Sequence, residues 1–180
     1  MNGQVEDSIL VRAAQDGDVD AFEELVRRYQ SSIYRVALRM LGSRADAQDA
    51  VQETFVRAWR ALPRFRHDSA VSTWLYRIVT RRALDKIASR RTTGTLDELE
   101  LERDAGPDPA QAAEDQERLR AVRQAIANLP AEQRAALVLR EFAGLSYQEV
   151  AQVLDASVPA IKTRIHRARL TIVQQTSSWQ

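Results

Sequence analysis

Basic side chains and aromatic rings are concentrated together between residues 57 and 91, where the only acids are Asp68 and Asp85. Cations of this density suit a phosphate backbone, and flat rings give unstacked bases a surface to stack on. The segment therefore favours binding of nucleic acid, including single strands. The residues we expect to make these contacts are Arg64, Phe65, Arg66, His67, Trp74, Arg77, Arg81, Arg82 and Lys86.

Two plainer interpretations of this segment stay open. Trp74 stands four residues before Ile78 and next to Leu75, so for that residue alone a place in the core is the better interpretation. A charged helix face is also often only a solvated surface. The nucleic-acid hypothesis gains weight because a second basic element occurs on the same short chain.

That second element is a predicted helix-turn-helix over about residues 146–165. Ser146 and Glu149 have the spacing of a capping box, and Asp155 begins a tight turn before the next helix. No acid occurs between Val158 and Arg169, and a basic helix after a tight turn suits the major groove. The alternative is a solvated helix of a bundle. The expected contact residues are Ser146, Tyr147, Ala160, Lys162, Thr163, Arg164, Arg167 and Arg169.

An acidic helix face lies before the first basic segment. Asp46, Asp49 and Glu53 are spaced by three and four residues, with Gln52 beside them and Phe55 in the apolar stripe of the same helix. Acids also suit a helix N-terminus, so a solvated cap and a site for a basic protein surface are both open. A metal site is the weaker alternative, because no further ligands follow in sequence.

Helical spacing of apolar residues predicts the elements that must position these groups. It extends over most of the chain, and no stretch sustains the alternation of a strand, so we expect an all-α fold. Residues 92–111 break the pattern with glycine, proline and a run of acids, which predicts an acidic flexible linker. Two small helical domains are expected, at residues 1–91 and 112–180, and the second contains the helix-turn-helix.

Composition excludes several classes of function. The 180-residue chain contains no cysteine, which rules out disulfides and thiolate chemistry. Neither a signal peptide nor the roughly 20 apolar residues of a membrane span is present, so we expect a cytoplasmic protein with no membrane insertion. There is no His–acid metal spacing and no glycine-rich phosphate loop. We therefore expect no catalytic residues, no metal, no cofactor and no enzyme activity.

Several motifs resemble those of extracytoplasmic-function (ECF) sigma factors of bacterial RNA polymerase. Asp49 to Trp59 resembles their polymerase-binding helix, and Thr73 to Ile78 with the arginines that follow resembles their promoter-melting helix. Three further motifs resemble their C-terminal domain: Leu129 to Arg134, Ser146 to Ala151 and Lys162 to Arg169. The resemblance covers nearly the whole chain apart from the linker and the tips.

The resemblance implies a role for each part. Asp46, Asp49, Gln52, Glu53 and Phe55 would bind core RNA polymerase at the clamp helices of its largest subunit, with the C-terminal domain near the flap region. Residues 62–72 and the next helix would open the promoter −10 element and hold a flipped base. The helix-turn-helix would recognise the −35 element. The linker would run toward the polymerase active centre, and an anti-sigma factor is an expected further partner.

Departures from the family pattern affect the expected base preference. Arg81 occupies a position where many relatives have Asn, and Pro159 and Ala160 replace a common Gly-Thr. Proline suits the first turn of a helix, so the fold is expected to persist. Two rival classes stay open, an ordinary helix-turn-helix repressor or activator and a helical enzyme. The repressor would bind duplex DNA tightly without polymerase.

Overall fold

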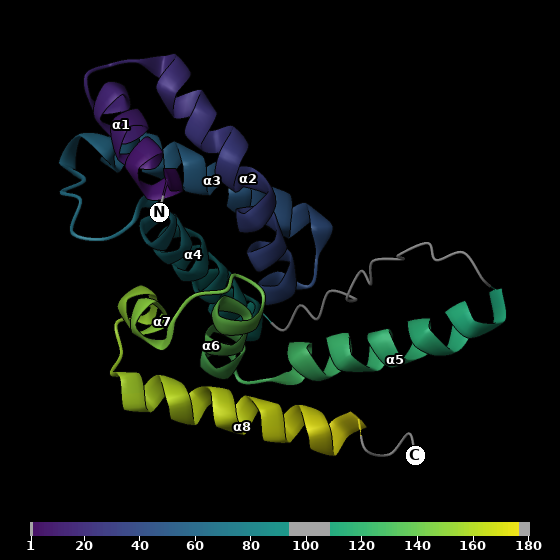
Figure 1. Cartoon of the computed structure of the whole chain (residues 1–180). Coiled ribbons are helices and arrows are strands. Elements are labelled where there is room, and N and C mark those ends of the chain that lie inside the picture. The colour runs from purple at the N-terminus through teal and green to yellow at the C-terminus, as the bar shows by residue number, and fades with distance from the viewer. Residues whose placement is uncertain (1, 94–108, 177–180) are drawn as a thin grey trace.

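The computed structural model describes residues 2–93 and 109–176, and within these ranges every regular element is a helix (Figure 1). The predicted linker falls mostly on residues 94–108, which lie outside the described ranges. None of the helices in the described part is long and apolar enough to span a membrane. The elements are α1 (Asn2–Gln15), α2 (Val19–Leu41), α3 (Arg44–Ala61), the 3-10 helix η1 (Leu62–Arg64), α4 (Val71–Thr93), α5 (Pro109–Asn128), α6 (Ala131–Glu141), α7 (Tyr147–Leu154) and α8 (Val158–Thr176).

The first domain is built by α1 to α4, and local signals set where its helices begin and end. Asp18 accepts a hydrogen bond from the Ala21 backbone and caps α2. Gly42, with φ 71°, ends that helix in the left-handed conformation, as its place in the sequence predicts. Ser43 then caps α3. The core residues fully enclosed between the helices include Ile33, Val36, Met40, Ala47, Ala58, Leu75 and Val79.

The second domain is built by α5 to α8 and contains the predicted helix-turn-helix. Both hydrogen bonds of the capping box between Ser146 and Glu149 form at the start of α7. Asp155 ends this helix with φ 49°, a conformation that Asp tolerates better than most residues. The inner face of α8 is anchored in the core by Ile161, Ile165 and Ala168, which are spaced by four and three residues.

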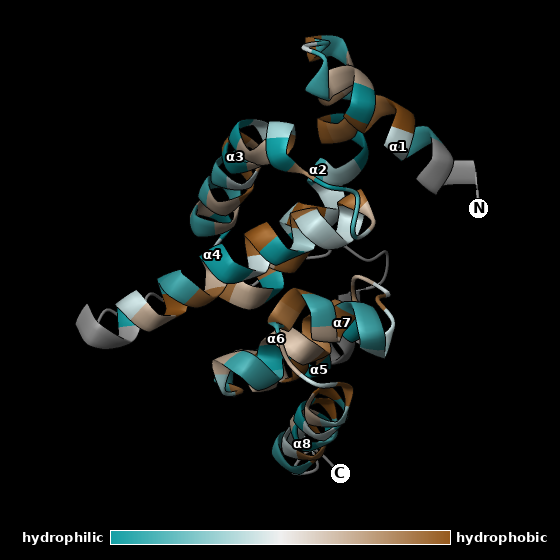
Figure 2. Ribbon diagram, turned by 90° about the vertical axis from the view of Figure 1, so that its left-hand side faces the viewer, coloured by the Kyte–Doolittle hydropathy of each residue, from teal (hydrophilic) through white to brown (hydrophobic). Residues whose placement is uncertain are grey.

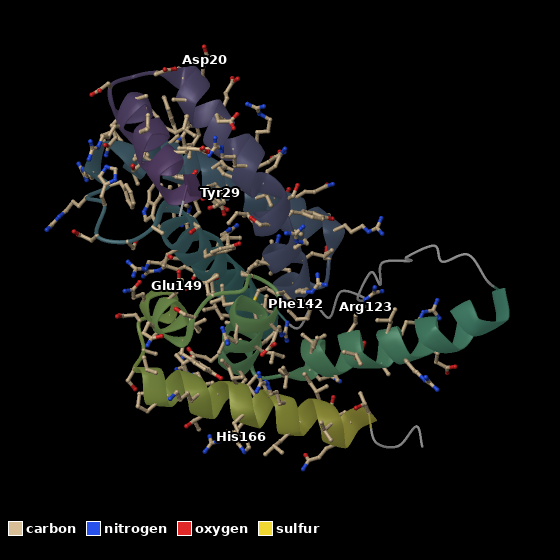
Figure 3. The ribbon with its side chains drawn as sticks, viewed as in Figure 1. Asp20, Tyr29, Arg123, Phe142, Glu149 and His166 are labelled. Atoms are coloured by element: carbon tan, nitrogen blue, oxygen red, sulfur yellow. The ribbon has the colours of Figure 1, made fainter. Side chains whose placement is uncertain are left out.

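The two domains contact each other through α6 and α7, which pack against α2 and α4. Figure 2 shows hydrophobic segments of α4 and α6 toward the middle of the molecule, where the domains meet. The guanidinium of Arg39 in α2 lies 4.1 Å from the ring centroid of Phe142 at the end of α6, and Figure 3 places Phe142 at this junction. Helices α4 and α5 extend into the predicted linker range, to Thr93 and from Pro109.

One buried cation links the domains. Arg134 is only 9% exposed. Its Nη1 atom donates to the Met40 carbonyl of the first domain at 2.6 Å. Its Nη2 atom donates to the carbonyls of Ala127 and Leu129, the latter at 3.2 Å. These hydrogen bonds engage both Nη atoms, which offsets part of the cost of burying the charge, so Arg134 fixes the α5–α6 turn and the domain contact together.

We predict that Arg134→Ala lowers the free energy of unfolding by about 1–3 kcal/mol, because it leaves buried carbonyls without a donor. Arg27→Ala is the matched control, since Arg27 pairs with Glu24 and its side chain is 74% exposed. Exposed pairs contribute about 0–1 kcal/mol. Urea denaturation followed by circular dichroism measures both changes. Equal losses in the two variants would show that Arg134 has no special structural role.

Candidate nucleic-acid interface

A cavity of about 230 Å³ lies beside the loop that joins η1 to α4. That is several times the ~30 Å³ that one water occupies in the liquid, so the space can admit a planar ring. One wall comes from α1 and the other from the loop and the start of α4. The lining residues are Asp7, Ser8, Val11, Phe65, His67, Ser69, Ala70 and Val71.

The rings of Phe65 and His67 line this cavity, and the ring of Trp74 packs against Phe65. The ring centroid of Phe65 lies 4.7 Å from that of Trp74 and 5.0 Å from that of His67. Trp74 is half-buried and packs against the core, so the structural interpretation of this residue holds. Its ring also extends the aromatic cluster, which leaves the stacking hypothesis compatible with the geometry. His67 has φ 59°, a left-handed conformation that is uncommon for a residue with a side chain.

The α1 wall of the cavity is fixed by a polar network. Asp7 is 8% exposed and accepts hydrogen bonds from the Tyr29 hydroxyl and from Arg28 Nη1, the second at 3.2 Å. Burial, and then the hydrogen bond to Asp7, raise the pKa of Tyr29 above its ordinary value. The phenol therefore keeps its proton and donates it, and the Asp7 carboxylate is held by both partners.

The basic residues of α4 divide between two faces. Arg77 and Arg81 are exposed, as expected for contacts with DNA. Arg82 and Lys86 instead face α3, where Arg82 forms an ion pair with Glu53 and Lys86 forms one with Asp46. A spacing of four residues places these two cations on one face. The sequence-predicted set is thus split, and the exposed members are available to a ligand without breaking an internal ion pair with α3.

Arg64 and Arg66, which the sequence also places in this interface, are exposed on the loop. Arg66 lies 3.5 Å from Asp68, and both side chains are mostly in solvent. An exposed pair of this kind is weak. The loop can therefore present both guanidinium groups to phosphates beside the cavity.

The polar residues of the predicted acidic face of α3 are also split between ion-paired and exposed positions. The side chain of Asp46 is 14% exposed and is held by Lys86 and Arg90. Glu53 is paired with Arg57 and Arg82. Asp46 therefore acts first as a counter-ion of α4, a role that its spacing in the sequence does not reveal.

The exposed surface of α3 is different from the predicted set. Asp49 and Gln52 are exposed, and the apolar side chains of Val56 and Trp59 lie beside them, 48% and 39% exposed. Phe55 is 9% exposed and belongs to the core, so its predicted contact with a partner has no surface in this structure. The available face is mixed acidic, amide-bearing and apolar, which suits a protein partner better than DNA.

The second basic surface lies on the helix-turn-helix. Lys162, Thr163 and Arg167 are exposed on α8, and His166 points away from the other helices on the outer side of α8 (Figure 3). Ala160 is half-buried in the first turn. The Thr163 hydroxyl donates to the Pro159 carbonyl at 3.0 Å, within the same helix.

Two arginines of this surface are held by acids of α6. Arg164 forms an ion pair with Glu132, and Arg169 lies 2.5 Å from Glu141. The hydrogen bond from Arg169 to Glu141, followed by the charge of that acid, raises the pKa of Arg169, so it stays cationic. Tyr147 lies between Arg140 and Lys162, whose cations are 4.8 and 5.7 Å from its ring centroid. With the Ser146 hydroxyl engaged in the cap, Tyr147 is the better-placed contact of the two.

The exposed cations of α4 lie beside the contact with the second domain. Arg77 Nη2 donates to the Gln152 carbonyl of α7 at 2.6 Å. A cavity of about 450 Å³ separates α4 from the second domain beside this hydrogen bond. Its lining residues are Arg77, Thr80, Arg81, Leu84, Glu132, Val153, Leu154 and Asp155.

Sequence reasoning missed two residues of this region. Gln15 of α1 contacts the loop beside the cavity, and Arg90 joins Lys86 on Asp46. The spacing of Arg82, Lys86 and Arg90, four residues apart each time, could have indicated one paired face. Nothing local marks Gln15. Within the described ranges no three His, Asp or Glu side chains form a group that could hold a metal.

Comparison with known families matches both domains. The family model for Sigma-70 region 2 matches residues 25–93, and the model for Sigma-70 region 4 matches residues 119–172. The ECF RNA polymerase sigma-E factor of Salmonella typhimurium is 38% identical over 182 residues, covering 96% of this chain and 95% of the relative. The RNA polymerase sigma-H factor of Pseudomonas aeruginosa is also 38% identical, covering 94% and 93% of the two chains.

Solved structures agree with this assignment. CnrH, solved in complex with the cytosolic domain of CnrY, has a TM-score of 0.73 and 29% identity, covering 96% of this chain and 98% of that one. The sigma factor RpoE of Bartonella quintana, solved with the anti-sigma factor NepR, has the same TM-score at 22% identity and covers 88% and 98% of the chains; at that identity it supports the fold alone. With regions 2 and 4 both matched and relatives aligned over nearly their full length, the chain belongs to the ECF sigma factor family of bacterial RNA polymerase.

Proposed function

We propose that this chain binds core RNA polymerase through α3 and directs it to promoters, with the N-terminal domain opening the −10 element and the helix-turn-helix recognising the −35 element. The observation that carries the proposal is the presence of two exposed basic surfaces on separate domains, together with a distinct protein-binding face on α3. An ordinary repressor needs only one of these three surfaces. We assign residues 1–91 and 112–180 to the two domains, joined by the acidic linker 92–111.

The −10 surface consists of the loop after η1 and the exposed face of α4. The cavity beside the loop offers room for one unstacked base, and the rings of Phe65 and His67 supply stacking contacts. Arg77 and Arg81 are placed to bind the phosphates of the opened strand. Arg82 and Lys86 support the surface from the α3 side.

The −35 surface lies on α7 and α8. Side chains from the early turns of a recognition helix reach base edges in the major groove, which assigns base contacts to Thr163 and Arg164. Lys162, Arg167 and Arg169 are assigned to phosphates, which fix position without base information. Glu132 holds Arg164 in the structure and orients its guanidinium before DNA arrives.

The partners follow from the surfaces. The exposed α3 face binds the clamp helices of the largest polymerase subunit, and the second domain lies near the flap region. An anti-sigma factor is a further proposed partner, because one structural neighbour was solved with the anti-sigma factor NepR and another with the cytosolic domain of CnrY. The covalent chemistry belongs to the polymerase, and the chain acts with it in the cytoplasm.

The domain contact supports weak promoter binding by the free chain. The hydrogen bond from Arg77 to Gln152 and the Arg39–Phe142 contact join the two domains and engage Arg77 of the −10 surface in that contact. Separation of the domains must precede engagement of both promoter elements. Polymerase binding supplies the differential affinity for the open arrangement that such a shift requires.

Replacing Asp49 with Arg tests the polymerase-binding face. Asp49 is exposed on α3, so its replacement leaves the paired acids Asp46 and Glu53 in place. We expect affinity for core RNA polymerase to fall roughly tenfold or more, which corresponds to about 1.4 kcal/mol. Competition for core against a labelled sigma factor measures the loss.

Glu23→Arg is the matched control for that variant, because Glu23 is an exposed acid on α2 and the charge change is the same. Circular dichroism should show equal helical content in both variants. Normal competition by Asp49→Arg, or an equal loss in Glu23→Arg, would refute the assignment of α3 as the binding face.

The two types of contact on α8 can be separated within the holoenzyme. Arg164→Ala should cost roughly 1–3 kcal/mol if the guanidinium makes a bidentate base contact, and the loss should disappear when one upstream base pair is also changed. Lys162→Ala should weaken binding to all upstream sequences alike and reduce the salt dependence. Footprinting of promoter variants over a range of salt concentrations measures both. A uniform loss in Arg164→Ala would move that residue to the phosphate-contacting set.

A further inference from the structure

Gln15 occupies a fixed position at the corner between the first two helices. It lies in the last turn of α1, and the chain then reverses through Gly17, whose φ is 99°. The corner is closed by backbone hydrogen bonds from Asp16, Gly17 and Asp18 to carbonyls of α1. A side chain that starts here is anchored by two helices. This corner precedes residues 25–93, which the region 2 family model matches.

The amide of Gln15 bridges the two ends of the turn that leads into the loop. Its Nε2 atom donates to the Leu62 carbonyl and to the Phe65 carbonyl, both at 2.9 Å. Its Oε1 atom lies 3.4 Å from His67 Nε2. A primary amide has two donors and one acceptor, so these three contacts engage both sides of the group. They join positions that are 47 to 52 residues apart in the sequence.

These contacts act on the residues that shape the cavity. Fixing the Phe65 carbonyl fixes the direction in which its ring leaves the backbone, between the rings of Trp74 and His67. His67 keeps a left-handed backbone, which costs free energy and persists only where the surroundings hold it. Phe65 and His67 both line the cavity. Gln15 contacts the loop without being one of the residues that line the cavity.

We propose that Gln15 is a positioning residue for −10 recognition. It holds the loop from Leu62 to His67 in the conformation that receives the flipped base. Helix α1 therefore contributes to the base-binding site through Gln15. The inference rests on the proposed role of the cavity. Preorganisation of this kind lowers the free-energy cost of ordering a loop on binding. Its loss affects opening of the −10 element and base preference, and leaves polymerase and −35 binding unchanged.

The test uses the holoenzyme formed with Gln15→Glu. This substitution keeps the shape of the side chain but replaces its donor atom with an oxygen that repels the two carbonyls. We expect strand opening to slow roughly five- to tenfold. The rate is measured by the permanganate reactivity of thymines in the opened strand. Affinities for single-stranded −10 oligonucleotides that differ at the flipped base should become nearly equal. Gln30→Glu is the matched control, because Gln30 is exposed on α2 and the chemical change is the same.

The remaining measurements separate the possible outcomes. Core affinity and −35 protection should be the same in both variants and in wild type. If Gln15→Glu fails to fold, Gln15→Met, which keeps the length without donor or acceptor, replaces it. Wild-type opening rate and base preference in a folded Gln15 variant would overturn the inference while the proposed function stands. If the wild-type holoenzyme itself opens no promoter, the proposed function fails.

Discussion

The buried guanidinium of Arg134 sets the arrangement of the whole molecule. A cation in an apolar interior must have its donors satisfied, and Arg134 uses the carbonyls of the α5–α6 turn and of Met40 for this purpose. The hydrogen bonds to the carbonyls of the α5–α6 turn shape the second domain. The hydrogen bond to the Met40 carbonyl places α6 on the end of α2. The same domain contact includes the hydrogen bond from Arg77 to the Gln152 carbonyl. If the domains separate, Arg134 Nη1 loses the Met40 carbonyl and must donate to water or to a new partner.

A second constraint comes from the pairing of charges between α3 and α4. Asp46 and Glu53 lie two helical turns apart and face the row formed by Arg82, Lys86 and Arg90. Arg77 and Arg81, which are outside this row, lie on the exposed side of α4. A count of basic residues therefore overstates the surface available to DNA. A count of acidic residues likewise overstates the acidic surface of α3, because Asp49 is the exposed acid of the predicted set. The net result is that the face we propose for polymerase binding and the face we propose for DNA binding lie on adjacent helices, which are joined by these ion pairs.

Much of the fold could be predicted because its signals are local. Ser43, Gly42, Ser146 and Asp155 set helix ends through contacts within a few residues, and the inward residues of α8 follow a simple period. The family motifs could be recognised for the same reason. The contacts of Gln15 with Leu62, of Arg134 with Met40 and of Arg77 with Gln152 join residues 47 or more positions apart, and no spacing rule predicts such a partner. The burial of Phe55 and the closed domain arrangement depend on tertiary packing, which a single helical stripe does not specify.

We propose that this chain carries RNA polymerase to promoters by dividing recognition between two domains. Run-off transcription with core RNA polymerase and the wild-type chain on genomic fragments tests that claim most directly. We expect discrete transcripts that require both the chain and the core enzyme, and that start downstream of a shared pair of sequence elements. The absence of any such transcript, together with tight sequence-specific duplex binding by the chain alone, would contradict the account and identify an ordinary helix-turn-helix repressor.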